Sequence, residues 1–123
     1  MAILIKELHS SLGAEIGGVD LSKPLAPDVK QEIDSAWKRH GVLVFRNQEL
    51  TDAEHVTFSH CFGELEVLPE TERTDSSLPE IFILSNVDST GTILPQENEA
   101  VVFNSLTWAW HTDSCYRKVP SKG

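Results

Sequence analysis

The stretch WAWHTDSCY, residues 108–116, decides how this sequence is interpreted. Inside it, His111 and Asp113 lie two residues apart, so in an extended backbone both side chains leave the same face. An imidazole nitrogen beside a carboxylate oxygen supplies two of the three ligands of the facial site that holds Fe(II) in oxygenases. We expect the aromatic residues before His111 to form a buried strand that shields the metal from water.

Two simpler interpretations of this motif stay open. A His-x-Asp tripeptide is short, and a histidine hydrogen-bonded to an aspartate at the end of a strand would leave the same pattern. The side chains of His111, Asp113 and Cys115 also alternate on one face and could hold structural zinc. Zinc prefers four closed ligands, and no fourth is evident, which disfavours that site.

Composition narrows the class of protein. The 123 residues suffice for one small domain with a core. The net charge of −9 argues against a nucleic-acid or anionic-membrane surface, so Trp108, Trp110 and Tyr116 are expected to be core or pocket wall rather than a platform for stacked bases. The sequence has neither an apolar run of about 18 residues nor a signal-peptide pattern. Its two cysteines are too few for a disulfide framework, so we expect a reduced, cytoplasmic setting.

The first half of the chain predicts two helices among short strands. Pro27 suits the first position of a helix and Gly41 supplies its stop, with an apolar stripe between them. Thr51 and Glu54 form a capping box that opens the second helix, which we expect to end at Gly63. Strands are expected at residues 3–8, in the first part of 13–21, and at 42–45.

The second half is less regular. Residues 68–78 are polar and bounded by prolines, which predicts a loop, and residues 88–91 predict a turn. Apolar runs at 81–84 and 101–103 predict a strand and an extended segment that leads into the His-x-Asp motif. The last residues, 119–123, resemble a connection about to enter another strand, so we expect the chain to continue in a longer protein.

Four segments, in this order, resemble the taurine/2,4-dichlorophenoxyacetate dioxygenase family, whose members are Fe(II)- and 2-oxoglutarate-dependent oxygenases. They are GAEIGGVDL at 13–21, VLVFRNQELT at 42–51, FSHCFGELE at 58–66 and WHTD at 110–113. No single segment is decisive, but the four together cover nearly the whole chain, from Leu12 to Pro120. The resemblance favours the metal site over the simpler interpretations of His-x-Asp.

The resemblance implies an α+β, mostly β fold: part of a double-stranded β-helix (jelly-roll) with two flanking helices. Residues 1–123 would form the N-terminal part of one dioxygenase domain. His111 and Asp113 match the first two iron ligands of the family. The implied cofactors are Fe(II), 2-oxoglutarate as cosubstrate and O₂, with oxidative decarboxylation to succinate and CO₂ coupled to hydroxylation of a substrate.

The chain also departs from the family pattern. The third ligand, a distal His, and the Arg that pairs with 2-oxoglutarate belong beyond residue 123, and the family is more than twice this length. None of the other histidines has a matching context: His9, His40, His55 and His60. We therefore expect an N-terminal fragment that holds iron poorly by itself.

Single positions that differ between branches of the family indicate the substrate class. Taurine-acting members carry a His where this chain has Leu68, and residues 84–95 are more similar to the phenoxyacetate branch. Many members of that branch have an Asn where Thr107 stands, with Asn104 nearby here. We expect hydroxylation of a small carboxylate-bearing substrate, an aryloxyalkanoate with ether cleavage. The alternatives are a taurine or alkylsulfonate dioxygenase, and a catalytically incompetent fragment or assembly module.

The expected partners are a small-molecule substrate and further copies of the chain, with no nucleic acid and no membrane. Self-association is expected because half a barrel leaves strand edges exposed, and such edges pair with other chains.

Overall fold

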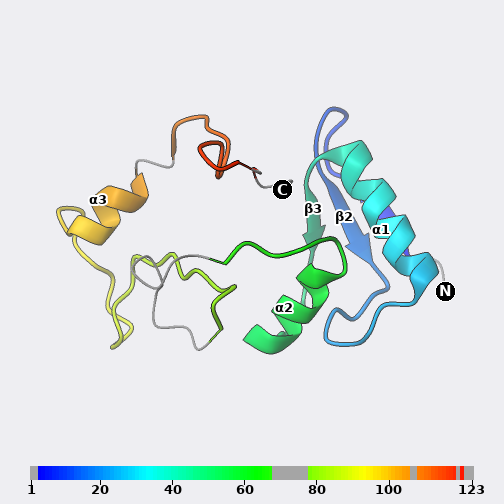
Figure 1. Ribbon diagram of the computed structural model, residues 1–123, viewed down its shortest axis with the longest axis horizontal. Helices are drawn as coiled ribbons and strands as arrows, with labels where there is room; N and C mark the ends of the chain where they lie inside the picture. Colours follow the sequence, from blue (N-terminus) through cyan, green and yellow to red (C-terminus); the bar gives the residue numbers. More distant parts are fainter. Residues whose placement is uncertain (1–2, 68–77, 106–107, 119, 121–123) are drawn as a thin grey trace. The chain divides into compact units, whose positions relative to one another are not determined.

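The structure, a computed structural model, describes residues 3–67, 78–105, 108–118 and 120. The chain divides into two compact units, an N-terminal unit of Met1–Val67 and a C-terminal unit of Leu68–Gly123. Figure 1 shows the regular elements, most of which belong to the N-terminal unit. Among the described residues, none of the helices has the length and apolar character needed to cross a membrane.

The N-terminal unit is built on a three-stranded sheet with the order β1-β2-β3. Strand β1 (Leu4–Glu7) runs antiparallel to β2 (Ala14–Gly17), and β2 runs parallel to β3 (Leu43–Phe45). A parallel pair needs a crossover connection, and helix α1 (Pro27–His40) provides it. The strands predicted near residues 3–8, 13–21 and 42–45 are thereby confirmed.

Helix α1 has the limits that its end signals predicted. Pro27 occupies its first turn and Asp28 adds negative charge there. Gly41 ends the helix with φ 73° and ψ −40°, and its N–H donates to the Trp37 carbonyl at 2.8 Å. The next N–H, of Val42, donates to the His40 carbonyl at 2.9 Å, so Gly41 is the centre of a γ-turn that favours a residue without a Cβ.

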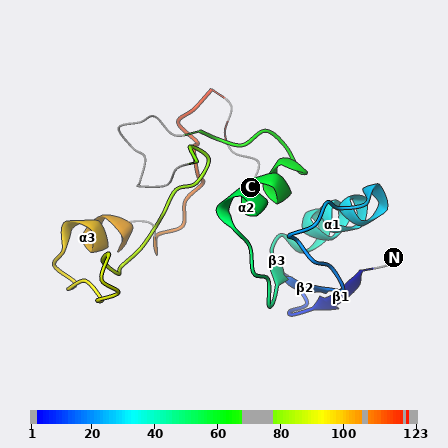
Figure 2. The same cartoon turned by 90° about the horizontal axis from the view of Figure 1, so that it is seen from below.

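The core of this unit lies between the sheet and α1, which runs along one face of the strands (Figures 1 and 2). Its buried members come from both elements: Ile3, Ile16, Ile33 and Ala36. His40 is buried as well, which confirms it as a packed histidine at the end of the apolar stripe.

Helix α2 (Asp52–His60) joins the core through aromatic rings. Its capping box is confirmed, because the Thr51 side chain accepts from the Glu54 N–H and the Glu54 carboxylate accepts from the Thr51 N–H at 2.8 Å. The Phe58 ring lies edge-on to Phe45, 5.7 Å between centroids, and 5.3 Å from Phe62. Cys61, directly after the helix, is half-buried.

The C-terminal unit is mostly irregular. A predicted turn at 88–91 is confirmed: the Asp88 carboxylate accepts from the Thr90 N–H at 2.8 Å and the Thr92 N–H at 3.0 Å. The turn is closed by one isolated bridge between Val87 and Ile93. The predicted loop at 68–78 lies, except for Leu78, outside the described residues.

Two predictions for this unit are wrong. Residues 101–103 lie in helix α3 (Glu99–Ser105) rather than in an extended segment, and the Asn98 side chain accepts from the Ala100 N–H at its start, at 2.9 Å. Residues 81–84 are not in a strand of the structure. The architecture is thus a small α+β fold with three helices, and its described residues do not form a jelly-roll.

Candidate metal centre

The candidate ligands His111 and Asp113 meet in the C-terminal unit. The Nε2 atom of His111 lies 2.9 Å from Oδ1 of Asp113. Both side chains remain open to solvent, with 48% of the His111 side chain and 80% of the Asp113 side chain exposed. The two side chains therefore lie on the same side of the backbone, as predicted. Because both are exposed, other ligands can reach them.

The backbone that presents them is not the predicted strand. Trp108 lies in a 3₁₀ turn, Ala109 and Trp110 form a bend, and residues 113–116 form turns, with Ser114 at φ 53°. A positive φ reverses the chain direction directly after Asp113, because an L residue there takes the left-handed conformation. The two side chains therefore meet in irregular backbone directly before this turn, and not in a strand.

A main-chain carbonyl fixes the imidazole ring. The Nδ1 atom of His111 lies 2.7 Å from the carbonyl oxygen of Ala109. Because that oxygen can only accept, Nδ1 carries a proton. The Asp113 carboxylate also only accepts, so its 2.9 Å contact with Nε2 is an ion pair with the protonated ring, and a metal at Nε2 would take the place of that proton. The Ala109 carbonyl hydrogen bond raises the pKa of His111, and the charge of Asp113 adds to that shift. Sequence reasoning missed Ala109 because its contribution is a backbone atom.

The predicted aromatic shield is wrong for the described structure of this unit. Trp108 is 87% exposed and Trp110 is fully exposed, so neither packs over the ligand pair. Neither lies in a strand: Trp108 is in a 3₁₀ turn and Trp110 is in a bend before His111. Both tryptophan side chains therefore lie on the surface and not in a core.

The donor set fits a divalent metal. Two ligand atoms that each bind a metal at about 2.0–2.2 Å, at a right angle, lie roughly 3 Å apart. The separation of Nε2 and Oδ1, 2.9 Å, matches that distance and is also that of a hydrogen bond between the two side chains. Nε2 is the nitrogen that would bind a metal, once it has given up its proton. The Ala109 carbonyl supplies the outer-shell hydrogen bond that commonly orients a ligating histidine.

A third protein ligand is not present among the described residues. They contain no group of three His, Cys, Asp or Glu side chains that could hold a metal ion. Within the described part of this unit, Cys115 therefore does not complete a zinc site with the pair. Leu68 and Thr107 lie outside the described residues, and the Asn104 amide donates to the Ser85 carbonyl at 3.4 Å.

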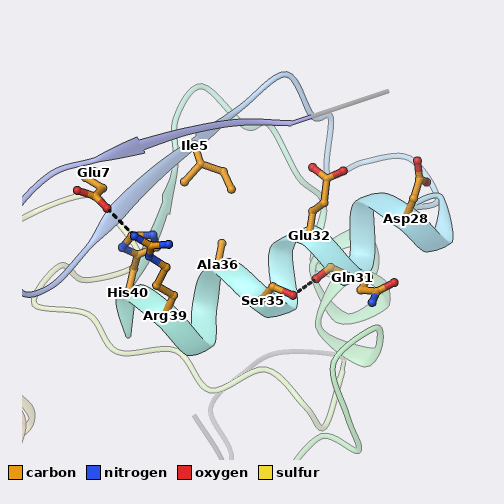
Figure 3. Close-up of a pocket in the computed structure, with 9 residues that line it drawn as sticks. All are labelled: Ile5, Glu7, Asp28, Gln31, Glu32, Ser35, Ala36, Arg39 and His40. Carbon is orange, nitrogen blue, oxygen red and sulfur yellow. Dashed lines mark hydrogen bonds and ion pairs between the residues drawn. The ribbon is translucent and has the colours of Figure 1, made fainter.

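A separate groove, of about 750 Å³, lies in the N-terminal unit between β1 and α1 (Figure 3). Ile5 and Ala36 line it, and the ion pair of Glu7 with Arg39, 3.5 Å, lies at the end of the groove near His40. It contains neither candidate ligand. Despite its volume, this groove is therefore not the candidate metal site.

Comparison with known proteins identifies the family. The family described as "Taurine catabolism dioxygenase TauD, TfdA family" matches residues 4–123. Because the match spans almost the whole sequence, the chain belongs to this family.

Individual relatives agree with that assignment. The alpha-ketoglutarate-dependent 2,4-dichlorophenoxyacetate dioxygenase of Cupriavidus pinatubonensis is 27% identical over 121 residues, which cover 96% of this chain and 42% of the relative. The (S)-phenoxypropionate/alpha-ketoglutarate-dioxygenase of Delftia acidovorans is 30% identical, over 93% of this chain and 37% of its own. The chain spans about two fifths of the length of these curated relatives.

A solved structure gives the same result. The crystal structure of AAD-2 in complex with Mn(II) and N-oxalylglycine superposes with a TM-score of 0.77 at 32% identity. The match covers 99% of this chain and 40% of that chain. The likeness therefore extends over both units and is not confined to the sheet.

Proposed function

We propose that residues 1–123 form the N-terminal part of an Fe(II)- and 2-oxoglutarate-dependent dioxygenase domain of jelly-roll fold. The observation that carries the proposal is the pairing of His111 Nε2 with Asp113 Oδ1 at 2.9 Å, in a chain whose family match spans residues 4–123. A bound iron would supply the redox chemistry that couples 2-oxoglutarate decarboxylation to hydroxylation. The third ligand and the Arg that pairs with 2-oxoglutarate would come from the remainder of the domain.

The roles of the described residues follow from their atoms. His111 offers Nε2 to the metal while its Nδ1–H stays on the Ala109 carbonyl, which fixes both the tautomer and the ring orientation. Asp113 offers a carboxylate oxygen on the same side. Cosubstrate dependence is supported by the AAD-2 complex, because N-oxalylglycine differs from 2-oxoglutarate only by NH in place of one CH₂.

The proposed substrate is a small carboxylate-bearing molecule, with aryloxyalkanoates as the leading class. Several relatives carry phenoxy acids in their names. Hydroxylation of the carbon next to the ether oxygen of an aryloxyacetate gives a hemiacetal, which breaks its C–O bond to release a phenol and glyoxylate. One O₂ is consumed: one oxygen atom enters the substrate and the other enters succinate.

A second candidate is oxidation of an alkylsulfonate or taurine. It is favoured by the alpha-ketoglutarate-dependent sulfonate dioxygenase of Saccharomyces cerevisiae, 31% identical over 94% of this chain and 27% of its own. A taurine dioxygenase structure from Burkholderia xenovorans is 43% identical over 53% of this chain, with a TM-score of 0.52. Both candidates predict the same metal ligands and differ in the anion recognised.

Succinate release by the full-length protein tests the proposal. With Fe(II), 2-oxoglutarate and O₂, we expect succinate and a phenol from phenoxyacetate. The variants His111→Ala and Asp113→Ala should each lose more than about 100-fold in rate, because metal affinity depends on both ligands. Glu97→Ala, on the same unit and outside the pair, is the matched control. Succinate with taurine but not with any aryloxyalkanoate would make the substrate assignment wrong, whereas no succinate with either would favour a non-catalytic module.

A further inference from the structure

The turn after the metal ligands holds an aromatic ring beside a cation. The Arg117 N–H donates to the Ser114 carbonyl at 2.9 Å, so the chain folds back within four residues of Asp113. The Cζ atom of Arg117 lies 5.8 Å from the centre of the Tyr116 ring. That distance is within the range of about 6 Å over which a guanidinium and an aromatic face attract.

This cation stands out against an acidic stretch. Residues 74–116 contain no Lys or Arg, while Asp88, Glu97, Glu99 and Asp113 are among their acidic residues. Arg117 is therefore the first positive side chain after the ligand pair. An anion drawn toward the metal by charge would find this positive side chain four residues after Asp113 in the chain.

The two side chains present complementary chemistry. Tyr116 is 79% exposed, so its ring face is open to a second ring, whereas Arg117 is half-buried and Lys118 is exposed. A guanidinium offers a planar fork of donors that matches a carboxylate. An aromatic face offers offset or edge-on packing to another ring. A molecule that joins an aryl ring to a carboxylate satisfies both.

We propose that Arg117 and Tyr116 determine substrate specificity, with Arg117 binding the substrate carboxylate and Tyr116 packing against its aryl ring. This assignment rests on the proposed function, since it places both contacts beside the proposed iron. An alkylsulfonate would use the cation and leave the ring without a partner. The pair therefore selects aryl carboxylates over alkyl anions.

Kinetics of the full-length protein test the assignment. Arg117→Leu should raise KM for phenoxyacetate by about 10- to 100-fold, the range for losing a hydrogen bond between charged groups, with kcat changed less than about threefold. Arg117→Lys should recover part of this loss. Lys118→Leu is the matched control, because it removes the same charge one residue away, and it should leave KM within about twofold. Tyr116→Leu should weaken the binding of phenoxyacetate. Inhibition by butoxyacetate, which has no ring, should stay unchanged.

Direct binding separates this assignment from the proposed function. Calorimetric titration with phenoxyacetate on the same variants reads out recognition without turnover. Weaker binding for Arg117→Leu alone supports the assignment even if the wild-type protein releases no succinate, a result that would overturn the proposed function. Equal effects of Arg117→Leu and Lys118→Leu, or no effect of either, would overturn the assignment while succinate release stood.

Discussion

At the scale of single residues, the geometry depends on atoms that a sequence does not display. The His111 and Asp113 pair could be predicted because the ligand types and their spacing are explicit. The Ala109 carbonyl that sets the His111 tautomer could not, because every residue has a carbonyl and only the local turn aims this one at Nδ1. The separate turn after Asp113 contains Ser114 at φ 53°, a conformation that a serine in the sequence does not indicate.

Gly41 carries the first prediction at this scale. Its positive φ lies in a γ-turn that an L side chain adopts only with strain, so Gly41→Ala should destabilise the N-terminal unit by about 2 kcal/mol. An added Cβ would also lie 2.8 Å from Leu12 Cδ1, but that exposed side chain can move aside. Urea unfolding followed by circular dichroism measures the change.

Gly17→Ala is the matched control for that substitution. Gly17 has no positive φ, and an added Cβ would meet Leu4 at an ordinary 3.7 Å. Its free energy of unfolding should change by less than about 0.5 kcal/mol. Equal destabilisation by the two substitutions would mean that the γ-turn stores no strain.

At the scale of elements, helices with explicit end signals were predictable. Pro27 and Gly41 mark α1, and Thr51 with Glu54 marks the start of α2. The apolar residues 101–103 were assigned to an extended segment because short apolar runs fit either period. Asn98 and Glu99, a side-chain acceptor and an acidic first turn, were the signal for α3. Strand formation at 81–84 could not be decided locally, because a strand requires a partner.

The capping box of α2 gives a prediction at this scale. Thr51→Ala removes the acceptor for the Glu54 N–H and should cost about 1 kcal/mol at pH 7. Thr57→Ala is the control, since Thr57 lies inside the helix and its hydroxyl donates to the Ala53 carbonyl. Because alanine favours helix interiors, the control should be neutral or slightly stabilising.

The effect of the capping box should depend on pH. The Thr51 N–H, and then its hydroxyl, hydrogen-bond the Glu54 carboxylate and lower its pKa. A lowered pKa means that the carboxylate stabilises the folded state above its unfolded pKa, and that this stabilisation is lost as pH falls through the folded pKa. The difference between wild type and Glu54→Gln should therefore shrink from pH 7 to pH 3. A constant difference across that range would contradict the role of the carboxylate charge.

At the scale of the whole molecule, the described sheet has two outer strands, β1 and β3, each with one neighbour. On β1, Leu4 is 71% exposed and Ile5 is 47% exposed. Free strand edges with apolar side chains pair with other chains, so the 123-residue chain should self-associate. Light scattering over a range of concentrations should show a mass above 13.7 kDa. Leu4→Lys should shift the population toward monomer, and a monomer at every concentration would make the prediction wrong.

The confinement of the core to the N-terminal unit has a consequence for the order of events during synthesis. Every member of that core, from Ile3 to Phe62, precedes residue 68. A ribosome adds about 5–20 residues per second, so His111 and Asp113 are made a few seconds after the last core residue. The sheet and α1 can therefore begin to assemble on the nascent chain before either proposed metal ligand exists. The elements of the first unit therefore precede the proposed metal ligands in the order of synthesis.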